Sequence, residues 1–170
     1  MIVFKHKPFG SKIFKKPNYR DSRGFLIPIN EFKNKLFSTN RQIVTFSKKF
    51  TLRGLHYKTK KREAKLMTIL KGKIFEVVID LNKNSKTFMQ YFSCYLYGNG
   101  YNQIYLPKNV AHGYYVVSKE AIIHYTISGK YEPQYETGLR WNDKSLNIKW
   151  PSGKKNLSKK DKKNYTKNLL

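Results

Sequence analysis

Short runs of β-branched and aromatic residues, separated by glycine, proline, asparagine and lysine, recur along this chain and limit what it can fold into. The clearest run is IFEVVIDL at residues 74–81. Successive side chains of a strand point to opposite faces of its sheet. One face of this strand is therefore expected to carry Phe75, Val77, Ile79 and Leu81, and the other Ile74, Glu76, Val78 and Asp80.

Further strands are predicted at residues 65–70, 88–96, 103–106, 113–117 and 121–128. Gly72 separates the first of these from residues 74–81 and predicts a hairpin turn there. Short strands at this spacing indicate an all-β sandwich or jelly roll, not alternating strands and helices. Two short helices are also expected, one at residues 30–36 with Asn30 as its cap, and one beginning at Ser158 with Asp161 in a capping box.

The length of 170 residues fits one domain, expected to span residues 1–170 with a basic C-terminal segment at residues 152–170. No stretch approaches the roughly 18 unbroken apolar residues of a membrane span. The start, MIVFKHKPFG, carries charges where a signal peptide needs an apolar block. We therefore expect a cytoplasmic protein without a membrane partner. The single cysteine, Cys94, cannot form an internal disulfide and is expected to be a small strand residue.

The formal net charge of +25 would ordinarily indicate an anionic partner such as nucleic acid. Only six of the 35 basic residues are arginine, however, and proteins that read nucleic acid favour the bidentate guanidinium. Lysine and asparagine are spread over the whole chain, turns included, as in a generally lysine-rich proteome. Nucleic acid is therefore not expected as a partner. On composition alone, the lysine-rich segment after Pro151 is typical of a solvated tail.

Two of the four histidines, His56 in RGLHY and His112 in VAHGY, lie close to a glycine that would let backbone or ligand approach. A lone histidine is more often structural than catalytic, and His6 and His124 show no partner pattern. The chain has no His-x-His pair, and no spacing predicts a metal site. It also has no phosphate loop or dinucleotide fingerprint. We expect neither metal nor cofactor, which leaves acid–base chemistry by His, Tyr and Lys if the protein is an enzyme.

Six segments taken together resemble the dTDP-4-dehydrorhamnose 3,5-epimerase family, in order and spacing, from about residue 20 to residue 161. They are DSRGF at 21–25, RGLHY at 53–57, KL at 65–66, GKIFEVVIDLNKNSKTF at 72–88, LPKNVAHGY at 106–114 and WNDKSLNIKWP at 141–151. The resemblance implies an all-β jelly-roll cupin with a few short helices, and a homodimer. It also implies a nucleotide-diphosphate sugar as substrate and a place in deoxysugar biosynthesis, such as that of lipopolysaccharide O-antigen.

The resemblance also implies a set of site residues. His56 matches the catalytic base, Tyr125 the acid, Lys65 the cation near the sugar ketone, and Asp161 the carboxylate that orients the base. The positions that match substrate contacts are Arg23, Arg53, His112, Glu136 and Lys160, with Tyr131 where an aromatic residue lies near the nucleotide. In a dimer, Arg23 is expected to reach the neighbouring subunit's pocket. Asp161 can serve its role only if the basic C-terminal segment folds back onto the domain, so we expect this segment to be ordered at least through Asp161.

The chemistry explains why such residues are needed. A hydrogen on a carbon beside a ketone becomes acidic only when the resulting enolate is stabilised, so a cation or donor must face the C4 oxygen. A base on one face of the sugar then removes the proton, and an acid on the other face returns one, which inverts the centre. A carboxylate paired with the imidazole fixes its tautomer and favours its protonated form.

The sequence departs from the family pattern at two places. Residues 43–50, IVTFSKKF, lack the amides of a Gln-x-Asn stretch that contacts substrate, and Pro28 replaces an acidic residue. The nucleotide, the sugar, and whether C3, C5 or both are inverted therefore stay open. The alternatives are a mono-epimerase, a 3,4-ketoisomerase, and a sugar-binding cupin without catalysis. Ketoisomerases resemble RG-x-HAH more than RGLHY, so residues 53–57 favour epimerisation.

Overall fold

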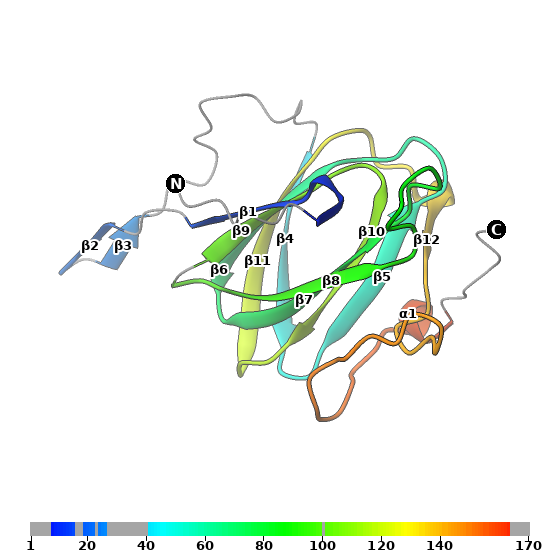
Figure 1. The fold of residues 1–170 in the computed structure, drawn as a ribbon. Helices are drawn as coiled ribbons and strands as arrows, with labels where there is room; N and C mark the ends of the chain where they lie inside the picture. The colour runs from blue at the N-terminus through cyan, green and yellow to red at the C-terminus, as the bar shows by residue number, and fades with distance from the viewer. Residues whose placement is uncertain (1–7, 16–18, 23, 27–40, 100, 164–170) are drawn as a thin grey trace.

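Two antiparallel sheets of five strands each face one another in a computed structural model that describes residues 8–15, 19–22, 24–26, 41–99 and 101–163 (Figure 1). The first sheet has the order β1 (Lys12–Lys15), β9 (Tyr101–Leu106), β6 (Lys65–Lys71), β11 (Glu120–Ile127) and β4 (Arg41–Lys48). The second has the order β12 (Glu136–Gly138), β5 (Leu52–Lys58), β10 (Val110–Val116), β7 (Lys73–Asp80) and β8 (Tyr91–Tyr97). The prediction of an all-β jelly roll is confirmed.

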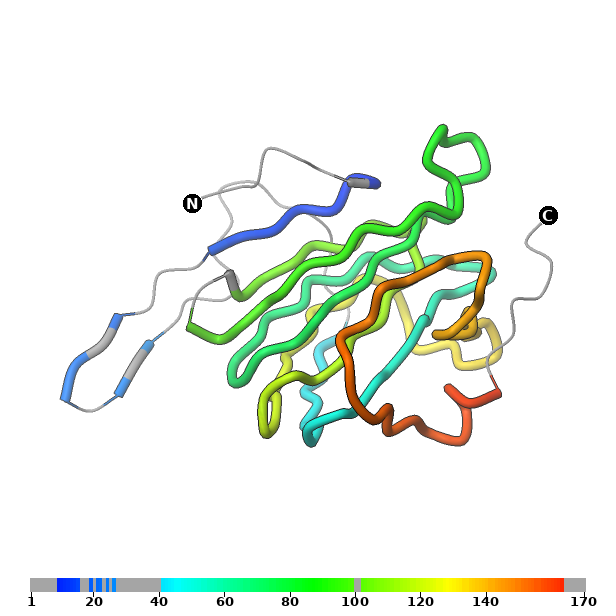
Figure 2. The backbone as a smooth tube through the Cα atoms, turned by 60° about the horizontal axis from the view of Figure 1, so that its bottom comes forward, coloured from blue at the N-terminus to red at the C-terminus, as the bar shows by residue number. Residues whose placement is uncertain are grey.

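The remaining elements are small. Strands β2 (Tyr19–Asp21) and β3 (Gly24–Leu26) pair with each other and extend away from the two sheets (Figure 2). The helical turns are η1 (Pro8–Gly10), η2 (Pro133–Tyr135) and the α-helix α1 (Lys159–Lys163). The helix predicted at residues 30–36 lies outside the described residues. No helix in the described part of the chain is long and apolar enough to cross a membrane.

The predicted hairpin at Gly72 is wrong, because β6 and β7 belong to different sheets. Each strand already has a hydrogen-bonded neighbour on both sides: β6 lies between β9 and β11, and β7 between β10 and β8. The chain therefore crosses from one sheet to the other at Gly72. The glycine itself is required, since its φ is +86° and a Cβ would lie 2.1 Å from the carbonyl oxygen of Glu120.

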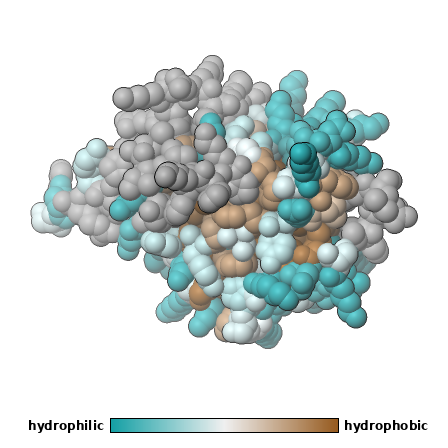
Figure 3. All heavy atoms as spheres, in the orientation of Figure 1, coloured by the Kyte–Doolittle hydropathy of each residue, from teal (hydrophilic) through white to brown (hydrophobic). Residues whose placement is uncertain are grey.

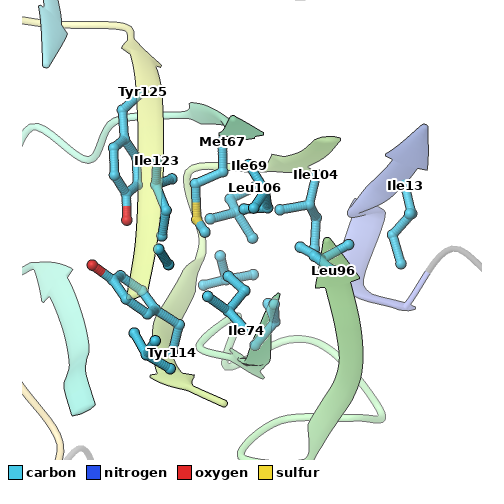
Figure 4. Close-up of a cluster of buried hydrophobic side chains, with 14 of the residues drawn as sticks. Ile13, Met67, Ile69, Ile74, Leu96, Ile104, Leu106, Tyr114, Ile123 and Tyr125 are labelled. Atoms are coloured by element: carbon cyan, nitrogen blue, oxygen red, sulfur yellow. The ribbon is translucent and has the colours of Figure 1, made fainter. Parts of the chain in front are cut away.

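Strand β7 contributes to two separate hydrophobic cores, as its alternation predicted. Ile74 and Val78 belong to the core between the sheets, where Met67, Leu96 and Ile123 also lie (Figure 4). Phe75, Val77, Ile79 and Leu81 face the other way into a second core. Burial of each such side chain stabilises the fold by about 1.5–3 kcal/mol, so the strand is fixed from both faces.

The chain between β12 and α1 covers the second core. Leu139, Leu146 and Trp150 pack there, and Leu157 contacts its edge. Helix α1 follows at once and begins with the predicted capping box: the backbone N–H of Asp161 donates to Ser158 Oγ at 3.0 Å, and that hydroxyl donates to Asp161 Oδ2 at 2.8 Å. The prediction that the basic segment is ordered at least through Asp161 is therefore confirmed, whereas composition alone indicated a solvated tail.

Candidate active site

A cavity of about 230 Å³ lies between the two sheets, with one wall from each. Strands β4, β6 and β11 line one side, and β5, β10, β12 and helix α1 line the other. Its lining is dominated by charged, histidine and tyrosine side chains: Arg41, Arg53, His56, Tyr57, Lys58, Glu63, Lys65, His112, Tyr114, Tyr125, Glu136 and Lys160, with Ile43, Thr45, Ile127 and Thr137. Such a lining suits a polar, anionic ligand and proton transfer.

His56 on β5 forms a short hydrogen bond with Asp161 on α1, 105 residues later in the chain, which becomes an ion pair when the imidazole is protonated. The distance between His56 Nε2 and Asp161 Oδ1 is 2.6 Å. Burial raises the pKa of Asp161, but the hydrogen bond and charge of His56, with Ser158 Oγ and the Gly54 N–H, lower it overall below the usual value. Asp161 is only 3% exposed and stays ionised, so it accepts from Nε2–H and leaves Nδ1 of His56 for a ligand.

Two facing glycines allow β5 and β10 to approach closely beside this pair. A Cβ on Gly54 would lie 2.5 Å from the Cα of Gly113, and one on Gly113 would lie 2.7 Å from the carbonyl oxygen of Arg53. The register shifts at this point and pairs His112 with His56 across the two strands. The glycines expected to permit close approach therefore bring both histidines to the same cavity.

Lys65 on β6 contacts His112, which in turn contacts the fully buried Glu76. Lys65 Nζ lies 3.3 Å from His112 Nε2, and His112 Nδ1 lies 2.9 Å from Glu76 Oε1. An ammonium can only donate, so Nε2 accepts and the histidine proton resides on Nδ1. Burial, then the charges of Lys65 and His56, hold the pKa of His112 well below its usual value, so the ring is neutral. Burial likewise raises the pKa of Glu76 well above its usual value.

Tyr125 on β11 lies against Tyr114 on β10, and their hydroxyl groups face each other across the gap between the sheets (Figure 4). Tyr114 in turn contacts Ser47 Oγ at 3.1 Å, and Arg53 Nε donates to that same oxygen at 3.1 Å. Burial is the main cause that raises the pKa of Tyr125 well above its usual value, followed by Tyr114 and the charge of Glu76. Tyr125 therefore keeps its phenolic proton near neutral pH, as a proton donor must.

Glu63, which sequence reasoning missed, holds three basic residues at the cavity wall. Arg41 Nη2 lies 3.0 and 3.1 Å from the two Glu63 oxygens, Lys58 Nζ 2.7 Å from Oε2, and Lys65 Nζ 3.9 Å from Oε1. The side chains of Lys58 and Glu63 are 3% and 6% exposed. No local pattern marks this cluster in the sequence. By contrast, Glu76 was a visible signal of a buried polar site, since it lies between Ile74 and Val78 on the inner face of its strand.

Most predicted site residues converge on this cavity. His56, Lys65, His112, Tyr125, Arg53, Glu136 and Lys160 line it, and Asp161 supports it from behind. Lys160 Nζ lies 3.4 Å from Glu136 Oε2. Tyr131 is 66% exposed, and its ring stacks against the guanidinium of Arg41, with 5.2 Å between Arg41 Cζ and the ring centroid.

The remaining candidates lie elsewhere. Arg23 and His6 fall outside the described residues. His124 points away from the cavity and bonds Gln42 Oε1 through Nε2 at 2.9 Å, as a structural histidine would. Within the described ranges, no three His, Cys, Asp or Glu side chains group as metal ligands.

Comparison with known proteins gives this arrangement a family. The sequence model of dTDP-4-dehydrorhamnose 3,5-epimerase matches residues 9–168. The chain belongs to this family. It is 34% identical, over 95% of its length and 87% of the relative, to the dTDP-4-dehydrorhamnose 3,5-epimerase of Shigella flexneri. The corresponding protein of Methanothermobacter thermautotrophicus is 32% identical over 84% of this chain and 80% of its own.

A solved structure agrees with the sequence relatives. The dTDP-6-deoxy-D-glucose-3,5-epimerase of Legionella pneumophila, in complex with dTDP-4-keto-L-rhamnose, superposes with a TM-score of 0.90. It is 31% identical and covers 96% of this chain and 91% of its own. The prediction that this member of the dTDP-4-dehydrorhamnose 3,5-epimerase family is an isomerase with a cupin fold is confirmed.

Proposed function

We propose that this epimerase binds a dTDP-linked 4-keto-6-deoxy sugar and inverts C3, C5 or both. The observation that carries the proposal is the meeting of the His56–Asp161 pair, Lys65 and Tyr125 in one cavity, although they come from four separate elements. The Legionella pneumophila relative was solved with dTDP-4-keto-L-rhamnose, which supports this class of substrate.

The proposed reaction needs only side chains of this chain. Nδ1 of His56 takes the proton from the carbon beside the ketone, and the electron pair moves onto the C4 oxygen as an enolate. The Lys65 ammonium stabilises that oxygen, since a charge that develops in a dry site is best met by a fixed cation. Tyr125 then donates its phenolic proton to the opposite face of the carbon. Proton exchange with water returns Tyr125 to its phenol form and His56 to its neutral form.

The substrate-binding roles are assigned to charged and aromatic side chains around the cavity. Arg53 can donate to the diphosphate, and Lys160 adds a further donor nearby. His112 lines the same cavity, where its Nε2 accepts from Lys65. Tyr131, which contacts the cavity residue Arg41, presents a largely exposed ring on which a nucleotide base can stack. Arg23 belongs to the same proposed set by resemblance alone.

A deuterium-exchange experiment tests the proposal. The protein is incubated in deuterated water with several 4-keto-6-deoxy nucleotide sugars, and the carbons that take up deuterium are located. We expect exchange at C3, C5 or both, and its loss in His56→Ala, which removes the base. Exchange at C3 alone would identify a mono-epimerase, movement of the carbonyl a ketoisomerase, and binding without exchange a non-catalytic cupin. Unchanged exchange in His56→Ala would exclude His56 as the base.

We further propose that the enzyme is a homodimer that works in the cytoplasm. Strand β4 is the edge of its sheet among the described strands, and Ile43, Val44 and Phe46 on it are exposed. Apolar residues also gather in the middle of the described surface in Figure 3, with hydrophilic residues around them. An exposed apolar edge strand is normally covered. Light scattering on the purified enzyme is expected to give twice the chain mass, and a fully active monomer would contradict the proposal.

A further inference from the structure

We infer that Glu63 is a positioning residue for the epimerisation: its one carboxylate holds the Lys65 ammonium in its charged form and aims it into the cavity, while it anchors Arg41 and Lys58 in the same wall. The inference rests on the proposed function only in giving Lys65 its role at the ketone. Glu63 itself touches no proposed substrate atom and acts through the cations around it.

The four carboxylates around the cavity are divided among different partners. Asp161 pairs with His56, Glu136 with Lys160, and Glu76 with His112. Among the described residues, Glu63 is the one carboxylate within 4.0 Å of Lys65 Nζ. Lys65 thus depends on a single close counter-charge, although the cavity contains several acids.

Glu63 is shared by three cations that would otherwise repel one another. Arg41 contacts both of its oxygens and Lys58 contacts Oε2. Arg41 cannot lose its proton in a protein. Lys58 has a second partner, the carbonyl oxygen of Lys130 at 3.0 Å. When the carboxylate is removed, the group most easily discharged is Lys65, whose remaining close neighbour is the neutral ring of His112.

The surroundings of Lys65 act on its pKa in opposite directions. Burial is the main cause that lowers the pKa of Lys65, and Arg41 on β4 adds to it. Glu63, two residues before Lys65 in the chain, opposes this most strongly, with smaller help from Glu136 on β12 and Glu76 on β7. The charged state of Lys65 is therefore a balance in which Glu63 is the largest favourable charge.

The sign of the expected effect follows from this balance. Lys65 must be protonated to stabilise the enolate, so activity falls as pH rises through its pKa. Glu63→Gln keeps the size of the side chain but removes the charge, and the pKa of Lys65 falls. An opposite charge within about 4–6 Å shifts a pKa by about 1 unit or more. We expect the basic limb of kcat against pH to move about one pH unit lower, with little change in KM.

Three variants make the test specific. Glu63→Asp keeps the charge and is expected to return the basic limb most of the way. Glu120→Gln is the matched control. Glu120 lies at the other end of β11, where its carboxylate pairs with exposed Lys71 at 2.6 Å. Its removal is expected to leave the basic limb of kcat against pH unshifted. The acidic limb serves as an internal reference, because no described contact joins Glu63 to His56.

A second measurement is independent of catalysis. Lysine amines of the full chain are reductively methylated with ¹³C, and the Lys65 signal, assigned by its absence in Lys65→Arg, is titrated by NMR. A Lys65 pKa that is lower in Glu63→Gln and restored in Glu63→Asp supports the inference. Absence of deuterium exchange in the wild-type protein would refute only the proposed function and would leave this measurement valid. An unchanged Lys65 titration with an unchanged basic limb would overturn the role of Glu63.

Discussion

The substitution Asp161→Asn removes the negative charge of Asp161, the partner of His56, but keeps the size and shape of the side chain. Asp161 Oδ2 accepts from Ser158 Oγ at 2.8 Å, and that same hydroxyl oxygen already accepts from the Asp161 N–H. An asparagine can place its NH2 group against Ser158 Oγ, which has room for a second donor. Its oxygen then still faces His56 Nε2. The substitution thus keeps the cap and the imidazole tautomer while it removes the negative charge.

The magnitude follows from what the charge does during the reaction. His56 gains a proton when it takes hydrogen from the sugar, so Asp161 stabilises the resulting imidazolium more than the neutral ring. A charge-assisted hydrogen bond of this kind contributes ~2 kcal/mol. At ~1.4 kcal/mol for each factor of ten, kcat is expected to fall about 30-fold. KM is expected to stay near its wild-type value, because Asp161 lies behind His56 and does not line the cavity.

The assay is steady-state turnover of a dTDP-4-keto-6-deoxy sugar, with deuterium uptake measured in parallel. Asp143→Asn is the control, since it removes one negative charge from a turn where Asp143 accepts from Ser145, away from the cavity. Circular dichroism and thermal melting check that both variants fold. A kcat for Asp161→Asn within about twofold of wild type, or a loss seen only in KM, would refute the role assigned to the ion pair.

Three other expectations are simpler. Tyr125→Phe removes only the hydroxyl, so the fold is expected to survive while formation of inverted product falls by about 100-fold or more, measured by NMR of the product; normal turnover would assign the donor elsewhere. Gly113→Ala is expected to destabilise the fold by about 2–3 kcal/mol, seen as a lower urea midpoint, because its Cβ would lie 2.7 Å from the carbonyl oxygen of Arg53; an unchanged midpoint would show that the strands can separate. A chain truncated after Gly153 loses Asp161 and is expected to be inactive. Full activity in that chain would contradict the role of the His56–Asp161 pair in catalysis.

Local pattern predicted those parts of the fold that depend on neighbouring residues. The alternation of residues 74–81 correctly divided strand β7 between two cores, because its side chains must alternate whichever strands lie beside it. The capping box at Ser158 was likewise predicted, since its partners are three residues apart. The connection at Gly72 was not, because a glycine turn between two strands looks the same whether the chain folds back or crosses to the other sheet.

The candidate site was likewise predicted only in part. His56 and Lys65 were named from a resemblance spread over six segments, and the fold places them in one cavity. Glu63 and Arg41 were not identified, because their contact joins residues 22 positions apart on the chain and depends on the pairing of β11 with both β4 and β6. No periodicity or spacing encodes such a contact. The prediction that the basic segment is ordered through Asp161 is confirmed, since Leu157 packs against the second core and Asp161 contacts His56. Composition alone had indicated a solvated tail.

The position of Asp161 on a helix of only five residues has a consequence for how the enzyme responds to heat. Helices this short are marginal by themselves, and elements with few buried contacts open before the core does. The two sheets can therefore remain intact at temperatures at which α1 has already detached and His56 has lost its partner. Activity is expected to fade reversibly several degrees below the melting of the sheets, so the temperature limit of this enzyme is set by its last helical turn and not by its two sheets.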